Sequence, residues 1–251
     1  MAFHNGLGSP LYPTPSAPSQ KYLNEEYVAS FADVVYSKPN IAVVADGASP
    51  DSISKWIGQF FKDVPTTPQS GQTLDTTPSK YYGGEQRLNH TAGNSMVLAF
   101  PGSGYKNGSP EMAVLAALIG GQSTIKWTSG YSILSKATSD LTDLSASSTN
   151  ISYSDAGLLT IQLSGSAASV RKGAHEAAKG LRAIADGSIS KEDVAKAVAN
   201  AKFVALDAVS LRGPNILLTG SGLVNSGEPV DLSSLASSLD TVTADKLQKV
   251  S

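Results

Sequence analysis

Two strand-like segments separated by only four residues limit the folds open to this sequence. The segments span residues 141–152 and 157–163, and the turn between them is Tyr-Ser-Asp-Ala. Parallel strands need a crossover of a dozen or more residues, so these two strands can pair only antiparallel. A second pair, residues 85–90 and 95–101, is separated by Thr-Ala-Gly-Asn. Strands that come in hairpins predict a largely antiparallel sheet.

Helical patterns make up most of the remaining sequence. Apolar residues recur at helical spacing from Val170 to Ile184, and Ser190 with Asp193 forms a capping box for the next helix. A buried strand is expected over residues 41–45. Helices are expected over residues 23–36, 110–119, 170–187, 190–211, 214–223 and 232–238, and further helices are expected to start at residue 50, near residue 129 and at residue 243. In the helix that starts at residue 50, the side chains of Ile53, Ile57, Phe60 and Phe61 are expected to point inward. The predicted fold class is α+β, with helices packed on one face of a largely antiparallel sheet.

Composition excludes several classes of function. The 251 residues include no cysteine, so a disulfide framework, a thiolate metal site and a cysteine nucleophile are ruled out. The formal net charge of −2 provides no basic excess for a phosphate backbone, which argues against a nucleic-acid partner. The longest apolar stretch, residues 112–119, is far shorter than the roughly 20 residues of a membrane-spanning helix.

The histidines do not suggest a metal site. His4, His90 and His175 are the only three, and they lie far apart in the sequence. Residues 175–179, His-Glu-Ala-Ala-Lys, match the zinc helix His-Glu-x-x-His except at the last position, where Lys179 cannot supply the second neutral nitrogen. We therefore predict no metal ligand in this chain.

Three glycine clusters also lack the context of a functional site. Residues 120–124, Gly-Gly-Gln-Ser-Thr, follow a predicted helix and lack the Gly-Lys-Ser/Thr ending of a phosphate-binding loop. They are more typical of a helix C-terminus. Residues 102–104 and 220–222 are equally weak signals, and no Gly-x-Ser-x-Gly elbow is present. The predicted set of catalytic and cofactor-binding residues is empty, and no cofactor is expected.

Four segments carry a resemblance to a known family. They are residues 3–12, residues 37–47, residues 82–87 (Tyr-Gly-Gly-Glu-Gln-Arg) and residues 152–158 (Ser-Tyr-Ser-Asp-Ala-Gly-Leu). Residues 37–47 and 152–158 resemble the second half of pitrilysin/insulinase-type proteins. Residues 82–87 resemble the core 2 group of that family, and residues 3–12 resemble the end of the first half in that group. The order and approximate spacing of all four segments agree. The similarity is most specific for the core 2 group of that family, the fungal-type subunits of the mitochondrial ubiquinol–cytochrome c reductase (cytochrome bc complex).

The resemblance implies a peptidase fold without peptidase activity. Active members of the family carry a His-x-x-Glu-His zinc site in their first half and supply an Arg and a Tyr after a Ser-Arg-Leu-like helix in their second half. The matching helix here is residues 131–136, and residues 137–148 contain neither Arg nor Tyr. The resemblance implies a structural core subunit that supports assembly of this respiratory-chain, electron-transport complex. It also implies that the redox cofactors of the complex belong to other subunits.

The same resemblance implies a location and partners. A core 2 subunit lies on the matrix side of the mitochondrial inner membrane, peripheral to it, and pairs with a core 1 homologue and other subunits of the complex. The alternative is a non-catalytic substrate-recognition subunit of the mitochondrial processing peptidase, which shares the fold. A free-standing metallopeptidase half is a third alternative.

The domain organisation follows from the same comparison. We expect residues 1–37 to form an extended, proline-containing arm and a helix that lead from a missing N-terminal half. Residues 38–251 are expected to form the C-terminal peptidase-like domain, truncated before its last strand. A sheet that lacks a strand exposes backbone donors and acceptors, so self-association of the chain is expected.

Overall fold

The computed structural model describes residues 2–4, 6–9, 24–68, 70–71, 77–89, 91, 93–106, 108–121 and 130–250. The chain divides into two compact units. One comprises residues 80–209 and 231–251 together with the first two residues, and we call it the sheet unit. The other comprises residues 3–79 and 210–230, and we call it the helical unit. The predicted boundary near residue 37 stays a prediction.

The sheet unit contains a three-stranded antiparallel sheet in the order β1-β3-β2. Its strands are β1 (Asn94–Gly102), β2 (Ser145–Ser152) and β3 (Gly157–Gly165). The Tyr153 backbone N–H donates to the Ala156 carbonyl at 2.8 Å and closes the four-residue turn between β2 and β3. The predicted hairpin is therefore confirmed, and so is the α+β class.

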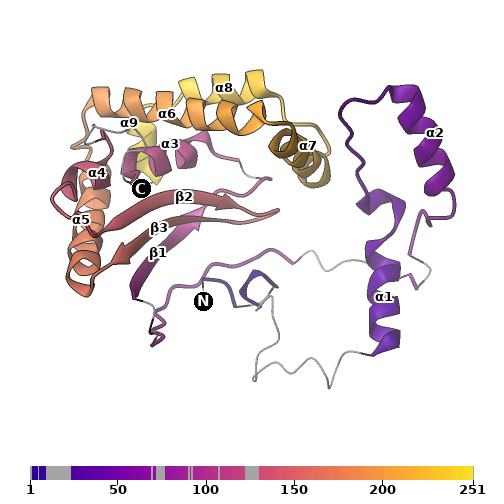
Figure 1. Cartoon of the computed structure of the whole chain (residues 1–251), viewed down its shortest axis with the longest axis horizontal. Coiled ribbons are helices and arrows are strands. Elements are labelled where there is room, and N and C mark those ends of the chain that lie inside the picture. Colours follow the sequence, from indigo (N-terminus) through magenta and orange to yellow (C-terminus); the bar gives the residue numbers. More distant parts are fainter. Residues whose placement is uncertain are drawn as a thin grey trace. The chain divides into compact units, whose positions relative to one another are not determined.

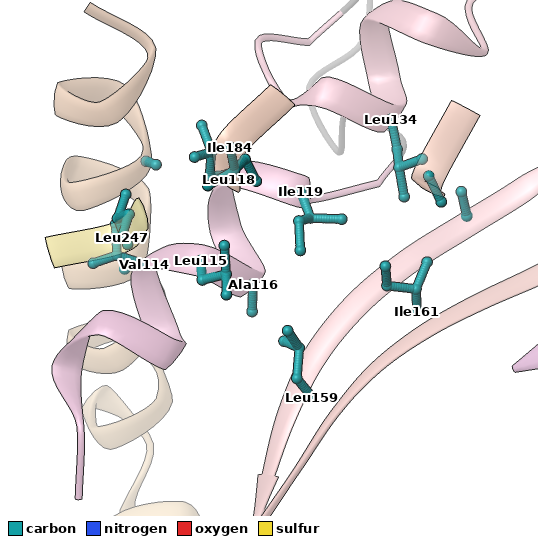
Figure 2. Close-up of a cluster of buried hydrophobic side chains, with 14 of the residues drawn as sticks. Val114, Leu115, Ala116, Leu118, Ile119, Leu134, Leu159, Ile161, Ile184 and Leu247 are labelled. Atoms are coloured by element: carbon teal, nitrogen blue, oxygen red, sulfur yellow. The ribbon is translucent and has the colours of Figure 1, made fainter. Parts of the chain in front are cut away.

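Helices α3 (Pro110–Ile119) and α5 (Ala167–Ala185) pack directly on this sheet. The α3 helix starts with proline at its first turn and is apolar almost throughout, which suits a helix buried on most sides. Its side chains Val114, Leu115, Leu118 and Ile119 are each at most 2% exposed and form the centre of the core with Ile161 of β3 (Figure 2).

The helices of the sheet unit that follow β3 complete the layer above the sheet (Figure 1). They are α5, which is capped by Ser166, then α6 (Lys191–Ser210), α8 (Leu232–Asp240) and α9 (Ala244–Val250). Lys202 of α6 forms an ion pair with Asp240 of α8 at 2.8 Å. The side chain of Gln248 donates to the Ala185 carbonyl at 2.8 Å and so ties α9 to the end of α5.

The helical unit contains α1 (Glu25–Val35), α2 (Pro50–Phe60) and α7 (Arg212–Ser226), with short 3-10 turns at Gly6–Gly8 and Lys38–Asn40. Asn24 and Ser49 cap the first two helices through their side-chain oxygens, as their residue types favour. The guanidinium of Arg212 lies 2.9 Å from the carboxylate of Asp46 and joins α7 to the segment before α2.

Three local predictions are wrong. Residues 41–45 are not a strand, because no neighbouring strand is described in the helical unit to complete a ladder. Residues 85–89 are not a strand either; they are mostly polar, and Leu88 is 80% exposed, so little apolar area is available for a pleated face. Phe60, expected to point inward from α2, is 72% exposed.

The short helix predicted from about residue 129 is α4 (Ile133–Ala137). It begins later because Ser132 is its N-cap, with the hydroxyl accepting from the Ser135 N–H. Residues 122–129 lie outside the described part of the chain, as does residue 90.

Candidate functional site

The segment of Ser132 and α4 matches the helix after which the family resemblance expects substrate contacts, and here its polar groups hold the fold together. The Ser132 hydroxyl donates to the Gly121 carbonyl at 3.1 Å, and the Ser135 hydroxyl donates to the Ser132 carbonyl at 2.9 Å. Lys136 forms an ion pair with Asp193 at 2.7 Å, which links α4 to the first turn of α6. Hydrogen bonds from Lys136 and Ser190 lower the pKa of Asp193.

Tyr131, next to this turn, also has a structural role. Its hydroxyl donates to the Ala117 carbonyl of α3 at 3.2 Å. Burial raises the pKa of the Tyr131 phenol, and a hydrogen bond with Asn200 opposes that shift. A phenol with a raised pKa stays protonated near neutral pH. Tyr131 therefore acts as a neutral donor that joins α3 to the α4 turn.

The glycine pair at 120–121 lies at the C-terminus of α3, as predicted for a helix end. Gly120 has φ of 60°, a conformation that favours glycine. A Cβ at Gly120 would collide with the side chain of Ser132, and one at Gly121 would collide with the Ala146 carbonyl. The pair thus permits close packing between α3, α4 and β2.

The other two glycine clusters are packing positions as well. A Cβ on Gly102 would collide with the side chain of Asn150, and one on Gly104 would lie 2.6 Å from the Ala156 carbonyl. Gly220 and Gly222 fall within α7, where Gly222 is approached closely by the Glu228 carbonyl, at 2.8 Å from a built Cβ. The geometry gives none of these glycines a phosphate-binding arrangement.

The histidines are not brought together among the described residues. His175 is exposed on α5, and the Lys179 ammonium forms a 3.7 Å ion pair with Glu176 on the same helix. His4 is exposed, and His90 lies outside the described residues. In the described part of the chain, no three His, Asp or Glu side chains cluster in a way that could hold a metal ion. That the whole chain binds no metal stays a prediction.

Sequence reasoning missed two polar clusters. Asn150 bonds to Ser103 and Ser152, which joins β2 to the end of β1. Asp143 accepts from the Ser169 hydroxyl at 2.6 Å and from the Ser166 N–H at 3.3 Å. These two hydrogen bonds lower the pKa of Asp143. Each cluster joins elements that are distant in sequence, so no local motif announces it.

The architecture defines the class of protein as an α+β domain with helices packed on an antiparallel sheet, and the polar side chains around α4 serve packing. A family model described as the peptidase M16 inactive domain matches residues 22–201. The chain belongs to this family, which confirms the resemblance noted in the sequence.

The relatives specify the group within the family. The chain is 50% identical over 248 residues to "Cytochrome b-c1 complex subunit 2, mitochondrial" of Neurospora crassa, covering 99% of this chain and 54% of that protein. It is 34% identical to the protein of the same name from Cryptococcus neoformans, and the match covers 92% of this chain and 51% of that protein. The identity to the protein of the same name from Schizosaccharomyces pombe is 30%, and the match covers 99% of this chain and 56% of that protein. The chain thus spans about half the length of these relatives.

A solved structure agrees on the fold. A chain of "Complex III2 from Candida albicans, Inz-5 bound" matches with a TM-score of 0.68 and 19% identity, covering 81% of this chain and 49% of that chain. The likeness supports the α+β architecture.

Proposed function

We propose that this chain is part of a structural, non-catalytic core subunit of the respiratory ubiquinol–cytochrome c reductase. The observation that carries the proposal is the 50% identity to the subunit 2 protein of Neurospora crassa, because it extends over 99% of the chain. A second and a third relative with the same name, at lower identity, support it.

The proposal includes the absence of peptidase activity. The matching family model is itself described as an inactive domain. The α4 turn supports this, because Ser132, Ser135 and Lys136 have intramolecular partners and no Arg or Tyr follows the helix up to residue 148.

We place the subunit on the matrix side of the mitochondrial inner membrane, paired with a core 1 homologue and other subunits. The relatives' names describe mitochondrial subunits of a cytochrome b-c1 complex. None of the helices in the described part of the chain is long and apolar enough to cross a membrane, which is compatible with a peripheral position. These names favour this function over a processing-peptidase subunit.

Two assays of the purified chain test the proposal. Size-exclusion chromatography with a purified core 1 homologue should give a joint peak, whereas separate elution of two folded proteins would contradict the pairing. A basic presequence peptide should remain intact with the chain alone. Hydrolysis that follows the chain through further purification, and stops with a chelator, would contradict the non-catalytic role.

A further inference from the structure

The helical unit contains an open groove of about 250 Å³ against α2. Its wall is apolar, formed by the side chains of Ile41, Val43, Ile57 and Phe61. Gly58, Lys38 and Lys62 complete the lining. The segment that was expected to be a strand, residues 41–45, thus contributes its apolar side chains to this groove.

Both lysines of the groove lack an ion-pair partner in the part of the chain that the structure describes. Both are exposed at the surface. An apolar groove edged by two cationic groups is complementary to a ligand that combines an anionic head with an apolar chain.

Next to the groove, α2 exposes an aromatic pair. The rings of Trp56 and Phe60 stack with centroids 5.6 Å apart and an interplanar angle of 18°. Trp56 is 51% exposed and Phe60 is 72% exposed. The Lys55 ammonium lies 5.9 Å from the centre of the Trp56 ring. Because Phe60 follows Ile57 by three residues, the pair continues the apolar side of the helix that faces the groove.

We propose that α2 and the groove form a binding site for an anionic phospholipid at a membrane surface. The acyl chain lies along Ile41, Val43, Ile57 and Phe61, and the phosphate lies between the two lysines of the groove. Trp56 and Phe60 enter the interfacial region of the bilayer, where amphipathic aromatic residues are favoured. This proposal does not depend on the proposed function.

The exposed aromatic pair selects a bilayer over other anionic ligands. A soluble phosphate would use the lysines alone and leave the apolar wall empty. A free fatty acid would fill the groove without covering Trp56 and Phe60. An acidic peptide is the protein alternative, and α2 favours lipid because its apolar side, aromatic pair and flanking lysines are the pattern of an interfacial helix.

Vesicle binding followed by tryptophan fluorescence tests the site. The chain has two tryptophans, so Trp127→Phe leaves Trp56 as the only reporter. With vesicles of phosphatidylcholine containing about a third phosphatidylglycerol, we expect a shift of Trp56 emission to shorter wavelength and co-sedimentation of the protein. Phosphatidylcholine vesicles should bind far more weakly. Each lysine near an anionic surface raises the affinity for the membrane about fivefold. The double variant Lys38→Gln, Lys62→Gln should therefore bind the anionic vesicles about 25-fold more weakly.

Two variants separate the groove from general electrostatics. Lys106→Gln with Lys249→Gln removes the same charge from exposed positions in the sheet unit and should leave vesicle binding nearly unchanged. Gly58→Leu should reduce lipid binding, because a side chain there extends from a groove-lining position that has no atom within 4 Å of a built Cβ. Circular dichroism establishes that each variant is folded.

Three results would overturn the proposal. The first is equal binding to neutral and anionic vesicles. The second is an unchanged Trp56 emission when the protein sediments with anionic vesicles. The third is a Trp56 shift that an acidic peptide or inorganic phosphate produces and vesicles do not, which would identify a protein or free-anion site instead.

Discussion

Asn150 and Ser103 form a reciprocal pair of hydrogen bonds between β2 and the end of β1. The Ser103 N–H donates to Asn150 Oδ1 at 3.1 Å, and Asn150 Nδ2 donates to the Ser103 carbonyl at 3.1 Å. Asn150→Ala removes the acceptor of the half-buried Ser103 N–H, while the Ser103 carbonyl keeps the Ser152 hydroxyl as a donor at 2.8 Å. We expect a loss of unfolding free energy of about 1–3 kcal/mol, measured by urea denaturation. Ser147→Ala, at an exposed position on the same strand, should stay within about 0.5 kcal/mol of the parent protein. Equal effects of the two changes would show that the pair does not stabilise the sheet.

The contact between α5 and α4 depends on a glycine. A Cβ at Gly180 would lie 2.5 Å from Cγ2 of Ile133, a branched side chain with little freedom to move. We expect Gly180→Ala to destabilise the protein by about 1–3 kcal/mol, although alanine is the better helix former. Gly58→Ala in α2 has no atom within 4 Å of the new Cβ and should be neutral or stabilising. Thermal denaturation of both variants decides the point, and a stabilising Gly180→Ala would contradict the packing described.

Acid stability should depend on Asp143. Hydrogen bonds from Ser169 and Ser166 lower its pKa in the folded state. The carboxylate therefore stabilises the fold fully above the ordinary aspartate pKa of about 3.9, and this stabilisation is lost as the pH falls through the lowered pKa. Asp143→Asn should reduce the difference in urea midpoint between pH 7 and pH 3. Asp63→Asn, at an exposed position, serves as the control. If the urea midpoints at pH 7 and pH 3 differ as much in the Asp143→Asn variant as in the parent protein, Asp143 does not contribute to acid stability.

Self-association stays a prediction, and the described sheet suggests where to test it. Within the described residues β1 pairs with β3 on one side only, and its Val97 is 56% exposed. Exposed edge strands with apolar side chains favour pairing between chains, and a lysine on the edge opposes it. Val97→Lys should lower the mass measured by light scattering at high concentration. Val224→Lys, a similar change at an exposed helix position, should not. A parent chain that is monomeric throughout the concentration series would contradict the prediction.

The sequence predicted the elements whose signals are local. The four-residue turn before β3, the start of α2 at residue 50 and the Ser190 cap of α6 depend on neighbouring residues, and all three are present. Residues 110–119 were predicted as a helix and are α3 with the same bounds.

The errors concern features that need a distant partner. Residues 41–45 have a strand-like composition, but a strand exists only if another strand completes its hydrogen bonds. The sequence of α2 did not predict that Phe60 points outward. The apolar residues of α2 occupy a wider side of the helix than the rest of the helical unit buries. The clusters of Asn150 and Asp143 were missed because they join residues 47 and 26 positions apart.

The most direct test of the proposed function replaces a relative's segment with this chain. In a Neurospora crassa strain that lacks its subunit 2, a chimera would carry this chain in place of the matching 248 residues. Native electrophoresis of detergent-solubilised mitochondrial membranes, with ubiquinol–cytochrome c reductase activity as the second readout, measures assembly. We predict that the chimera migrates with the complex and restores activity well above the level of the deletion strain. A chimera that accumulates as a folded protein but migrates apart from the complex, with activity at the deletion level, would contradict the proposal.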